Sequence, residues 1–94
     1  MAHEAPEVVV VSISETVIEG EKAEFRCQAS GIPTPIITWE RLGFDLPKGA
    51  FARNGLLIIP SAGPEDAGTY ICKAVNSEGD DKANVQLEVI GKEM

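Results

Sequence analysis

Two cysteines that bracket a single tryptophan constrain the fold of this chain more than any other feature. Cys72 lies 45 positions after Cys27, Trp39 follows the first cysteine by about a dozen positions, and Tyr70 precedes the second by two. In a small β-rich chain, this order is typical of two sheets joined by one disulfide that packs on the tryptophan, with the tyrosine closing a corner between the sheets. The pattern therefore predicts an all-β sandwich.

Alternation of apolar and polar residues supports this architecture, because side chains on a strand point to opposite faces in turn. No stretch keeps the i, i+3, i+4 spacing of a helix. We expect strands at 8–11, 15–18, 22–29, 36–41, 50–53, 56–59, 69–76 and 82–90. The side chains expected to face the core are Ala23, Phe25, Cys27, Ala29, Ile37, Trp39, Leu57, Ile59, Ala62, Tyr70, Cys72, Ala74, Val85, Leu87 and Val89.

Turn residues separate these strands. Asn54-Gly55 suits a two-residue hairpin turn in which both positions need positive φ. The prolines of segment 31–35 keep that loop out of the strand ladder, and residues 76–79 turn the last hairpin. Pro64 and Glu65 indicate a single short helical turn before the corner.

The corner motif consists of Asp66, Gly68 and Tyr70. Gly68 permits a tight backbone, and the Tyr70 hydroxyl can satisfy a backbone group a few residues upstream. We expect Asp66 either to pair with Arg53 across the base of the sandwich or to leave that arginine in solvent. These roles are structural and do not define a binding site.

Length and charge limit the organisation and the partners. Ninety-four residues suit one domain, which we place at residues 6–91 with short tails at 1–5 and 92–94. A net charge of −7 argues against nucleic acid and against an anionic membrane surface, and no apolar run is long enough to insert in a membrane. Two cysteines with none left over indicate one structural disulfide and an oxidising compartment, or else two buried thiols in a cytosolic relative.

The residues needed for catalysis are missing. His3, the only histidine, lies near the N-terminus, so no histidine-based triad can form. If both cysteines are bridged, neither can act as a nucleophile or metal ligand. Glu78, Asp80 and Asp81 cluster near a turn but lack the ligand number of a dedicated Ca²⁺ loop. We therefore expect no enzyme, no metal and no cofactor.

Apolar residues at outward positions are the remaining candidates for function. Leu56 and Ile58, flanked by Lys22 and Arg26, form one candidate protein-contact face. Clustered apolar residues on a surface indicate a partner or a neighbouring domain, whereas isolated ones are ordinary. The second candidate face contains Ile71, Lys73 and Val75, and Phe44 and Phe51 lie near the middle edge.

The chain resembles the immunoglobulin superfamily from about residue 6 to residue 90. The split first strand and the short segment between residues 41 and 50 resemble the intermediate (I-set) type, whose fold is an immunoglobulin-like β-sandwich of two antiparallel sheets. Segments 37–39, 46–47, 53–60, 64–72 and 74–76 together are similar to the tandem immunoglobulin repeats of the perlecan family of basement-membrane proteoglycans. The resemblance implies no binding residue that can be carried over.

Three functional classes follow from this resemblance. The first is a secreted module of a basement-membrane or adhesion protein, monomeric in isolation, that contacts neighbouring domains of its own chain and extracellular matrix or cell-surface proteins. The second is an intracellular module of a muscle scaffold, in which the cysteines stay reduced. The third is a receptor ectodomain with a defined ligand. A sandwich fold alone does not decide among them.

Overall fold

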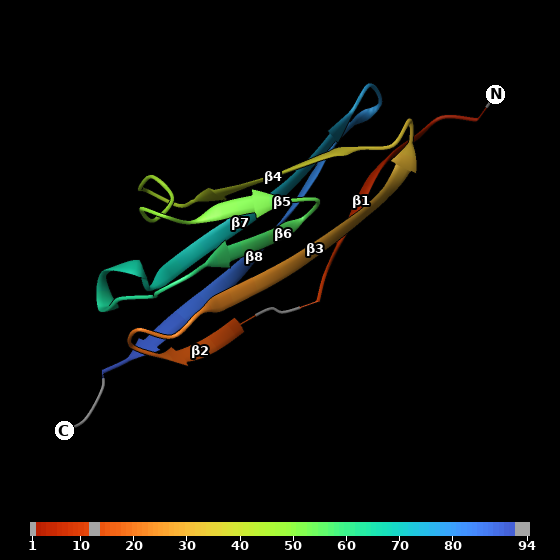
Figure 1. Cartoon of the computed structure of the whole chain (residues 1–94). Helices are drawn as coiled ribbons and strands as arrows, with labels where there is room; N and C mark the ends of the chain where they lie inside the picture. Colours follow the sequence, from red (N-terminus) through yellow and green to blue (C-terminus); the bar gives the residue numbers. More distant parts are fainter. Residues whose placement is uncertain (1, 12–13, 92–94) are drawn as a thin grey trace.

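The computed structural model describes residues 2–11 and 14–91 and contains eight strands and one short helical turn (Figure 1). The elements are β1 (Glu4–Val10), β2 (Ser14–Ile18), β3 (Ala23–Ile32), β4 (Ile36–Arg41), β5 (Phe51–Arg53), β6 (Leu56–Ile59), the 3₁₀ turn η1 (Pro64–Asp66), β7 (Gly68–Asn76) and β8 (Gly79–Ile90). The predicted all-β class is confirmed.

The strands form two four-stranded sheets that pack face to face. Their strand orders are β1-β3-β6-β5 and β2-β8-β7-β4, and Figure 1 shows β3, β5 and β6 in front of β7 and β8. All pairings are antiparallel except that of β2, which lies parallel to β8. The chain leaves the first sheet after β1 and joins the second sheet as β2, which explains why the first strand is split in the sequence.

The inward side chains of both sheets meet in one core, as the alternation predicted. The fully or nearly fully buried residues include Phe25, Cys27, Trp39, Tyr70 and Cys72. Val8, Val10, Ile37, Leu46, Ala50 and Val89 pack against this cluster from its margin. Sheet-on-sheet packing of this kind buries the apolar half of each strand and leaves the other half in solvent.

Strand β1 begins at Glu4, four residues earlier than the sequence predicted. Glu4 pairs with Ile32 at the end of β3, and the Asn76 side-chain amide donates to the Glu4 carbonyl at 2.8 Å and to the Pro33 carbonyl at 2.9 Å. Residues 4 and 5, which the sequence placed in a tail, therefore belong to a strand. The hydrogen bonds that hold this start of β1 join residues far apart in the sequence, so the local alternation of apolar and polar residues does not reveal them.

Two carboxylates accept backbone hydrogen bonds from the opposite sheet near the place where the chain passes from one sheet to the other. Asp81 on β8 accepts the Val8 backbone N–H at 2.8 Å, and Glu15 on β2 accepts the Glu24 backbone N–H at 3.0 Å. Desolvation raises the pKa of the Glu15 carboxyl, and its proximity to the Glu24 charge raises it further, while the backbone hydrogen bond lowers it. Asp81 thus accepts from a backbone N–H on the edge strand β1 that would otherwise be free to pair with another strand.

The sandwich is elongated, with extents of 60 × 21 × 19 Å. The described chain begins near one end of the long axis and ends near the other (Figure 1). The outer faces of the two sheets run along the long sides of the domain.

Candidate functional site

The buried residues around the two cysteines stabilise the fold and provide no side chain that could act in catalysis. Cys27 and Cys72 form a disulfide, as predicted. The Gly55 carbonyl accepts from the Trp39 indole N–H at 3.0 Å and from the Cys27 backbone N–H at 2.9 Å. Gly55 has φ of 85°, and a Cβ there would collide with the Cys27 carbonyl, so this turn position requires glycine.

Aromatic packing completes this centre. The Phe25 ring lies between those of Trp39 and Tyr70, with centroid distances of 6.0 and 5.9 Å. Such separations fall in the range of favourable aromatic pairs. The three rings and the disulfide join the two sheets.

The corner between the sheets has the expected tyrosine hydrogen bond but a different arginine. The Tyr70 hydroxyl donates to the Asp66 carbonyl at 2.6 Å, and the Asp66 carboxylate accepts from the Gly63 backbone N–H at 2.8 Å. Burial raises the pKa of the Tyr70 hydroxyl, although the Arg41 charge opposes the shift. The polar end of the tyrosine therefore stays neutral and bonded at physiological pH.

Arg41, and not Arg53, lies at this corner. It donates to the carbonyls of Glu65 and Ala67, and its guanidinium lies 5.7 Å from the centre of the Tyr70 ring. Arg53 is exposed on β5 and lies on the outer side of the opposite sheet, pointing away from the corner. Of the two alternatives for Arg53, the structure shows the exposed arginine and not the pair with Asp66, because strand alternation turns Arg53 outward.

The titratable side chains elsewhere in the described part of the chain form no recognisable metal-binding group. His3 contacts Glu78 at 3.3 Å on an exposed surface, and Asp81 is occupied with the β1 backbone. Within residues 2–11 and 14–91, no group of three or more His, Cys, Asp or Glu side chains is placed to hold a metal ion. The helical residues described include no segment long and apolar enough to cross a membrane. The outer sheet faces are therefore the candidate sites.

We call the outer side of sheet β1-β3-β6-β5 the β6 face. Register places Leu56 between Arg26 and Arg53, and Ile58 between Glu24 and Phe51. Leu56 and Ile58 are half-buried, while Phe51 is 51% exposed. The residues predicted around Leu56 and Ile58 thus lie together on one face that mixes apolar, basic and acidic side chains, and their role in protein contact stays a prediction.

Val9 on strand β1 and Val11 just after it extend this face, and the sequence analysis missed both. Val9 lies beside Gln28, and the Val11 backbone N–H donates to the Arg26 carbonyl at 3.0 Å. Val11 is 61% exposed. The signal was available, because the unbroken valine run 8–11 must turn half of its side chains outward whichever sheet it joins.

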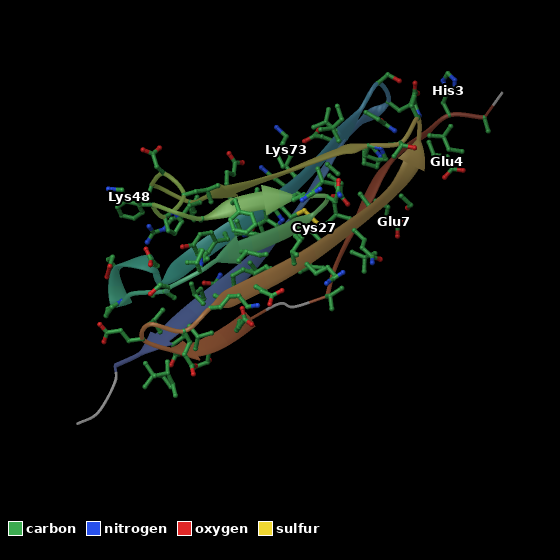
Figure 2. The ribbon with its side chains drawn as sticks, in the orientation of Figure 1. His3, Glu4, Glu7, Cys27, Lys48 and Lys73 are labelled. Carbon is green, nitrogen blue, oxygen red and sulfur yellow. A yellow bond between two sulfur atoms is a disulfide. The ribbon has the colours of Figure 1, made fainter. Side chains whose placement is uncertain are left out.

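We call the outer side of sheet β2-β8-β7-β4 the β7 face. It carries Ile71, Lys73 and Val75, and Figure 2 shows Lys73 projecting away from the sandwich. Lys73 lies directly opposite Lys82 on β8. Ile36, opposite Val75 and 71% exposed, belongs to this face and was also missed.

The two edge phenylalanines do not fold back onto the core. Phe44 is exposed and lies under the Arg41 guanidinium, 4.8 Å from the ring centre. Phe51 belongs to the β6 face. Cation–π contact explains the position of Phe44, whereas Phe51 has only the apolar neighbours of its own face.

Comparison with known proteins identifies the family and a wide range of contexts. The family model of the immunoglobulin I-set domain matches residues 6–89. The mouse basement membrane-specific heparan sulfate proteoglycan core protein is 50% identical over 70 residues, which cover 74% of this chain and 2% of that protein. Drosophila titin is 42% identical over 94% of this chain and less than one per cent of its own length. The chain thus spans a very small part of the relatives it matches.

A solved structure gives the same result for the fold. The ectodomain of mouse nectin-like molecule 4, which contains three immunoglobulin domains, superposes with a TM-score of 0.85 at 31% identity. The match covers 95% of this chain and 31% of that one. Matrix, muscle and cell-surface proteins therefore all contain domains similar to this one.

Proposed function

The chain belongs to the immunoglobulin I-set family, and from that premise we propose that it is a non-catalytic module of a large, secreted matrix or adhesion protein. In this role it spaces its neighbours along the parent chain and offers an outer face to other proteins. The fold is one that is generally non-catalytic, and the described side chains provide no catalytic arrangement.

The observation that carries the proposal is the buried disulfide. Cys27 is 2% and Cys72 is 0% exposed, and they are bonded across the core with no free cysteine in the part of the chain that the structure describes. Structural disulfides persist in oxidising compartments and are rare in the cytosol. The similarity to a basement-membrane proteoglycan supports the same compartment.

The shape supports a spacing role. The described chain enters and leaves at opposite ends of a body 60 Å long (Figure 1). Consecutive domains of this kind can follow one another end to end, which leaves both outer faces accessible along the resulting rod.

A second candidate, an intracellular module of a muscle scaffold, is supported by the 42% identity to Drosophila titin. It predicts the same fold with Cys27 and Cys72 reduced. A third, the ligand-binding ectodomain of a receptor, is supported by the likeness to the nectin-like ectodomain. It predicts one saturable ligand rather than several contacts along a rod.

The decisive experiment is the mass of the intact protein isolated from its native source under thiol-blocking conditions, with and without reductant. The secreted module predicts a species lighter by two hydrogens that gains two alkylation sites on reduction. Two cysteines already blocked before reduction would contradict the proposal and favour the muscle scaffold.

A binding experiment separates the spacer from the receptor and locates the contact face. Recovery of proteins from matrix extract is compared for the parent domain, Leu56→Asp on the β6 face and Val75→Asp on the β7 face. We expect one variant to lose recovery and the other to serve as its control. Equal recovery by both would remove both faces as contact surfaces.

A further inference from the structure

We propose that the β6 face binds an extended acidic segment of a partner protein, whose side toward the domain carries carboxylate side chains alternating with apolar ones. This inference rests on the proposed function to the extent that the domain acts by contacting other proteins. It does not depend on the compartment in which the domain resides.

The first argument is the arrangement of two arginines. Arg26 and Arg53 both lie directly opposite Leu56, one on each neighbouring strand, and both are exposed. Adjacent strands lie about 4.8 Å apart, so the two backbones are roughly 10 Å apart with an apolar side chain between them. The ion pairs found in the described residues are His3–Glu78 and Lys22–Glu24, so neither guanidinium is bonded to a carboxylate there, although the Arg26 charge lies near enough to Glu24 to help lower the pKa of that carboxyl.

This lack of an ionic partner is unusual for so acidic a chain. The sequence carries 15 acidic and 8 basic residues, yet among the residues that the structure describes the middle of the β6 face holds only one carboxylate, that of Glu24. The Lys22 amine holds that carboxylate at 2.9 Å and lowers its pKa. The other acidic residue on this side, Glu7, lies at the far end of β1. The face therefore presents a local positive charge on a negative domain.

The second argument is the apolar frame around the arginines. Val11 lies beside Arg26, and Phe51 lies directly opposite Ile58 in the next row of the sheet. A partner that covered these residues would exclude water from the guanidiniums, which strengthens their bonds to carboxylates. Arginine suits this role because its planar fork binds a carboxylate through two parallel hydrogen bonds.

Alternation in the partner follows from the geometry of the face. Basic and apolar side chains alternate across the strands in the row Val11, Arg26, Leu56 and Arg53. Because every second side chain of an extended segment points to the same side, a partner with a carboxylate, an apolar residue and a carboxylate at positions i, i+2 and i+4 can match both kinds of contact, whereas a segment whose facing side is uniformly charged or uniformly apolar matches only one.

Other occupants fit the face less well. A sulfated polysaccharide needs many clustered cations, and here two arginines are separated by apolar residues on a domain of net charge −7. A second copy would have to present either its own β6 face or its β7 face. The first would oppose arginines to arginines, and the second would place them against a face on which the facing pair Lys73 and Lys82 lies between the carboxylates of Glu40 and Asp80.

The test uses a synthetic peptide in which glutamate and valine alternate at every second position, with serine between them, so that one side of the extended peptide presents both kinds of side chain. It is titrated into isotope-labelled domain and followed by NMR. We expect saturable shifts confined to β1, β3, β5 and β6. The same peptide with glutamine in place of glutamate is expected to bind at least about tenfold more weakly, because each charged hydrogen bond contributes more than a neutral one.

Matched variants assign the binding to the arginines. Arg26→Gln with Arg53→Gln is expected to weaken binding by about tenfold or more, and Arg26→Lys with Arg53→Lys by a smaller factor, since the charge remains but the fork is lost. Lys73→Gln with Lys82→Gln removes the same charge from the β7 face and is expected to change the affinity by less than about twofold.

Several outcomes would overturn the inference. These are equal weakening by the arginine and lysine pairs, shifts confined to the β7 face, and no binding of the acidic peptide. Preferential binding of a heparin oligosaccharide, or self-association through the β6 face in sedimentation, would overturn it too. A reduced Cys27 and Cys72 in native protein would defeat the secreted assignment while leaving this result standing. Loss of matrix-protein recovery in Val75→Asp but not in Leu56→Asp would overturn this inference and leave the secreted assignment standing.

Discussion

On strand β3, Phe25 and Cys27 are buried in the core, while Arg26 between them is exposed on the β6 face. The same contrast separates Cys72 from Ile71 and Lys73 on β7. Inward residues are fixed by contacts from both sheets at once. Outward residues have neighbours only within their own sheet, so they are free to differ between domains that share the fold. Stability therefore depends on the inward side of each strand, and the proposed partner contact on the outward side.

Two phenylalanines provide the largest test of this division. Phe25→Ala removes a ring that is 0% exposed and packed between two others, and should lower the free energy of unfolding by about 3–5 kcal/mol. Phe51→Ala on the β6 face should change it by about 0.5 kcal/mol or less. Urea unfolding of both variants is the measurement. Similar losses in the two would contradict the division.

The disulfide comes next in expected magnitude. Replacing Cys27 and Cys72 together by alanine releases a closed loop of 45 positions and should lower the free energy of unfolding by about 2–4 kcal/mol. Calorimetry under oxidising conditions measures the change. Binding to any partner of the outer faces should survive in the folded fraction. A variant of unchanged stability would show that the bridge is dispensable.

The corner hydrogen bond should contribute less. Tyr70→Phe keeps the ring in the core but removes the donor to the Asp66 carbonyl, and we expect a loss of about 1 kcal/mol. Tyr70→Phe and Asp66→Asn can be combined in a double-mutant cycle. Since Tyr70 bonds the backbone carbonyl and not the carboxylate, the two effects should be nearly additive, and strong coupling would contradict this geometry.

Glu15, whose carboxylate on β2 accepts a hydrogen bond from β3 in the other sheet, should have the smallest effect on stability. Its carboxyl pKa is raised in the fold, so its contribution to stability is present at low pH and is lost as the pH rises through the folded value. Glu15→Gln keeps an acceptor for the Glu24 N–H and should stabilise the domain at neutral pH by less than about 0.5 kcal/mol, because the group is largely screened by solvent. The gain should vanish below the ordinary glutamate pKa. A pH series of urea midpoints checks this, and a destabilised variant at neutral pH would contradict it.

The sequence predicted the inward half of the molecule well because each inward residue obeys a local rule. Alternation identified Phe25, Cys27 and Leu57, and the Tyr-x-Cys spacing identified the corner. It failed where the partner is distant in sequence. The start of β1 depends on Asn76, and the arginine at the corner is Arg41 because β4 ends beside β7.

The outward half was only partly predictable. Leu56 and Ile58 broke the local alternation and were found, whereas Val9 and Val11 join their face only through pairing with β3. A sequence alone does not show which strands are neighbours, so it cannot show which outward residues share a surface. The arginine pair across Leu56 became visible only once the order β3-β6-β5 was known.

The most direct test of the division between the two sides is the urea unfolding of a variant that carries Val9→Thr, Val11→Thr and Phe51→Thr together. Threonine suits exposed strand positions, so the change removes apolar surface from the β6 face without opposing the strands. We predict a free energy of unfolding within about 1 kcal/mol of the parent domain. A loss of about 3 kcal/mol or more, comparable with a core truncation, would show that these residues hold the sandwich together and would contradict the account.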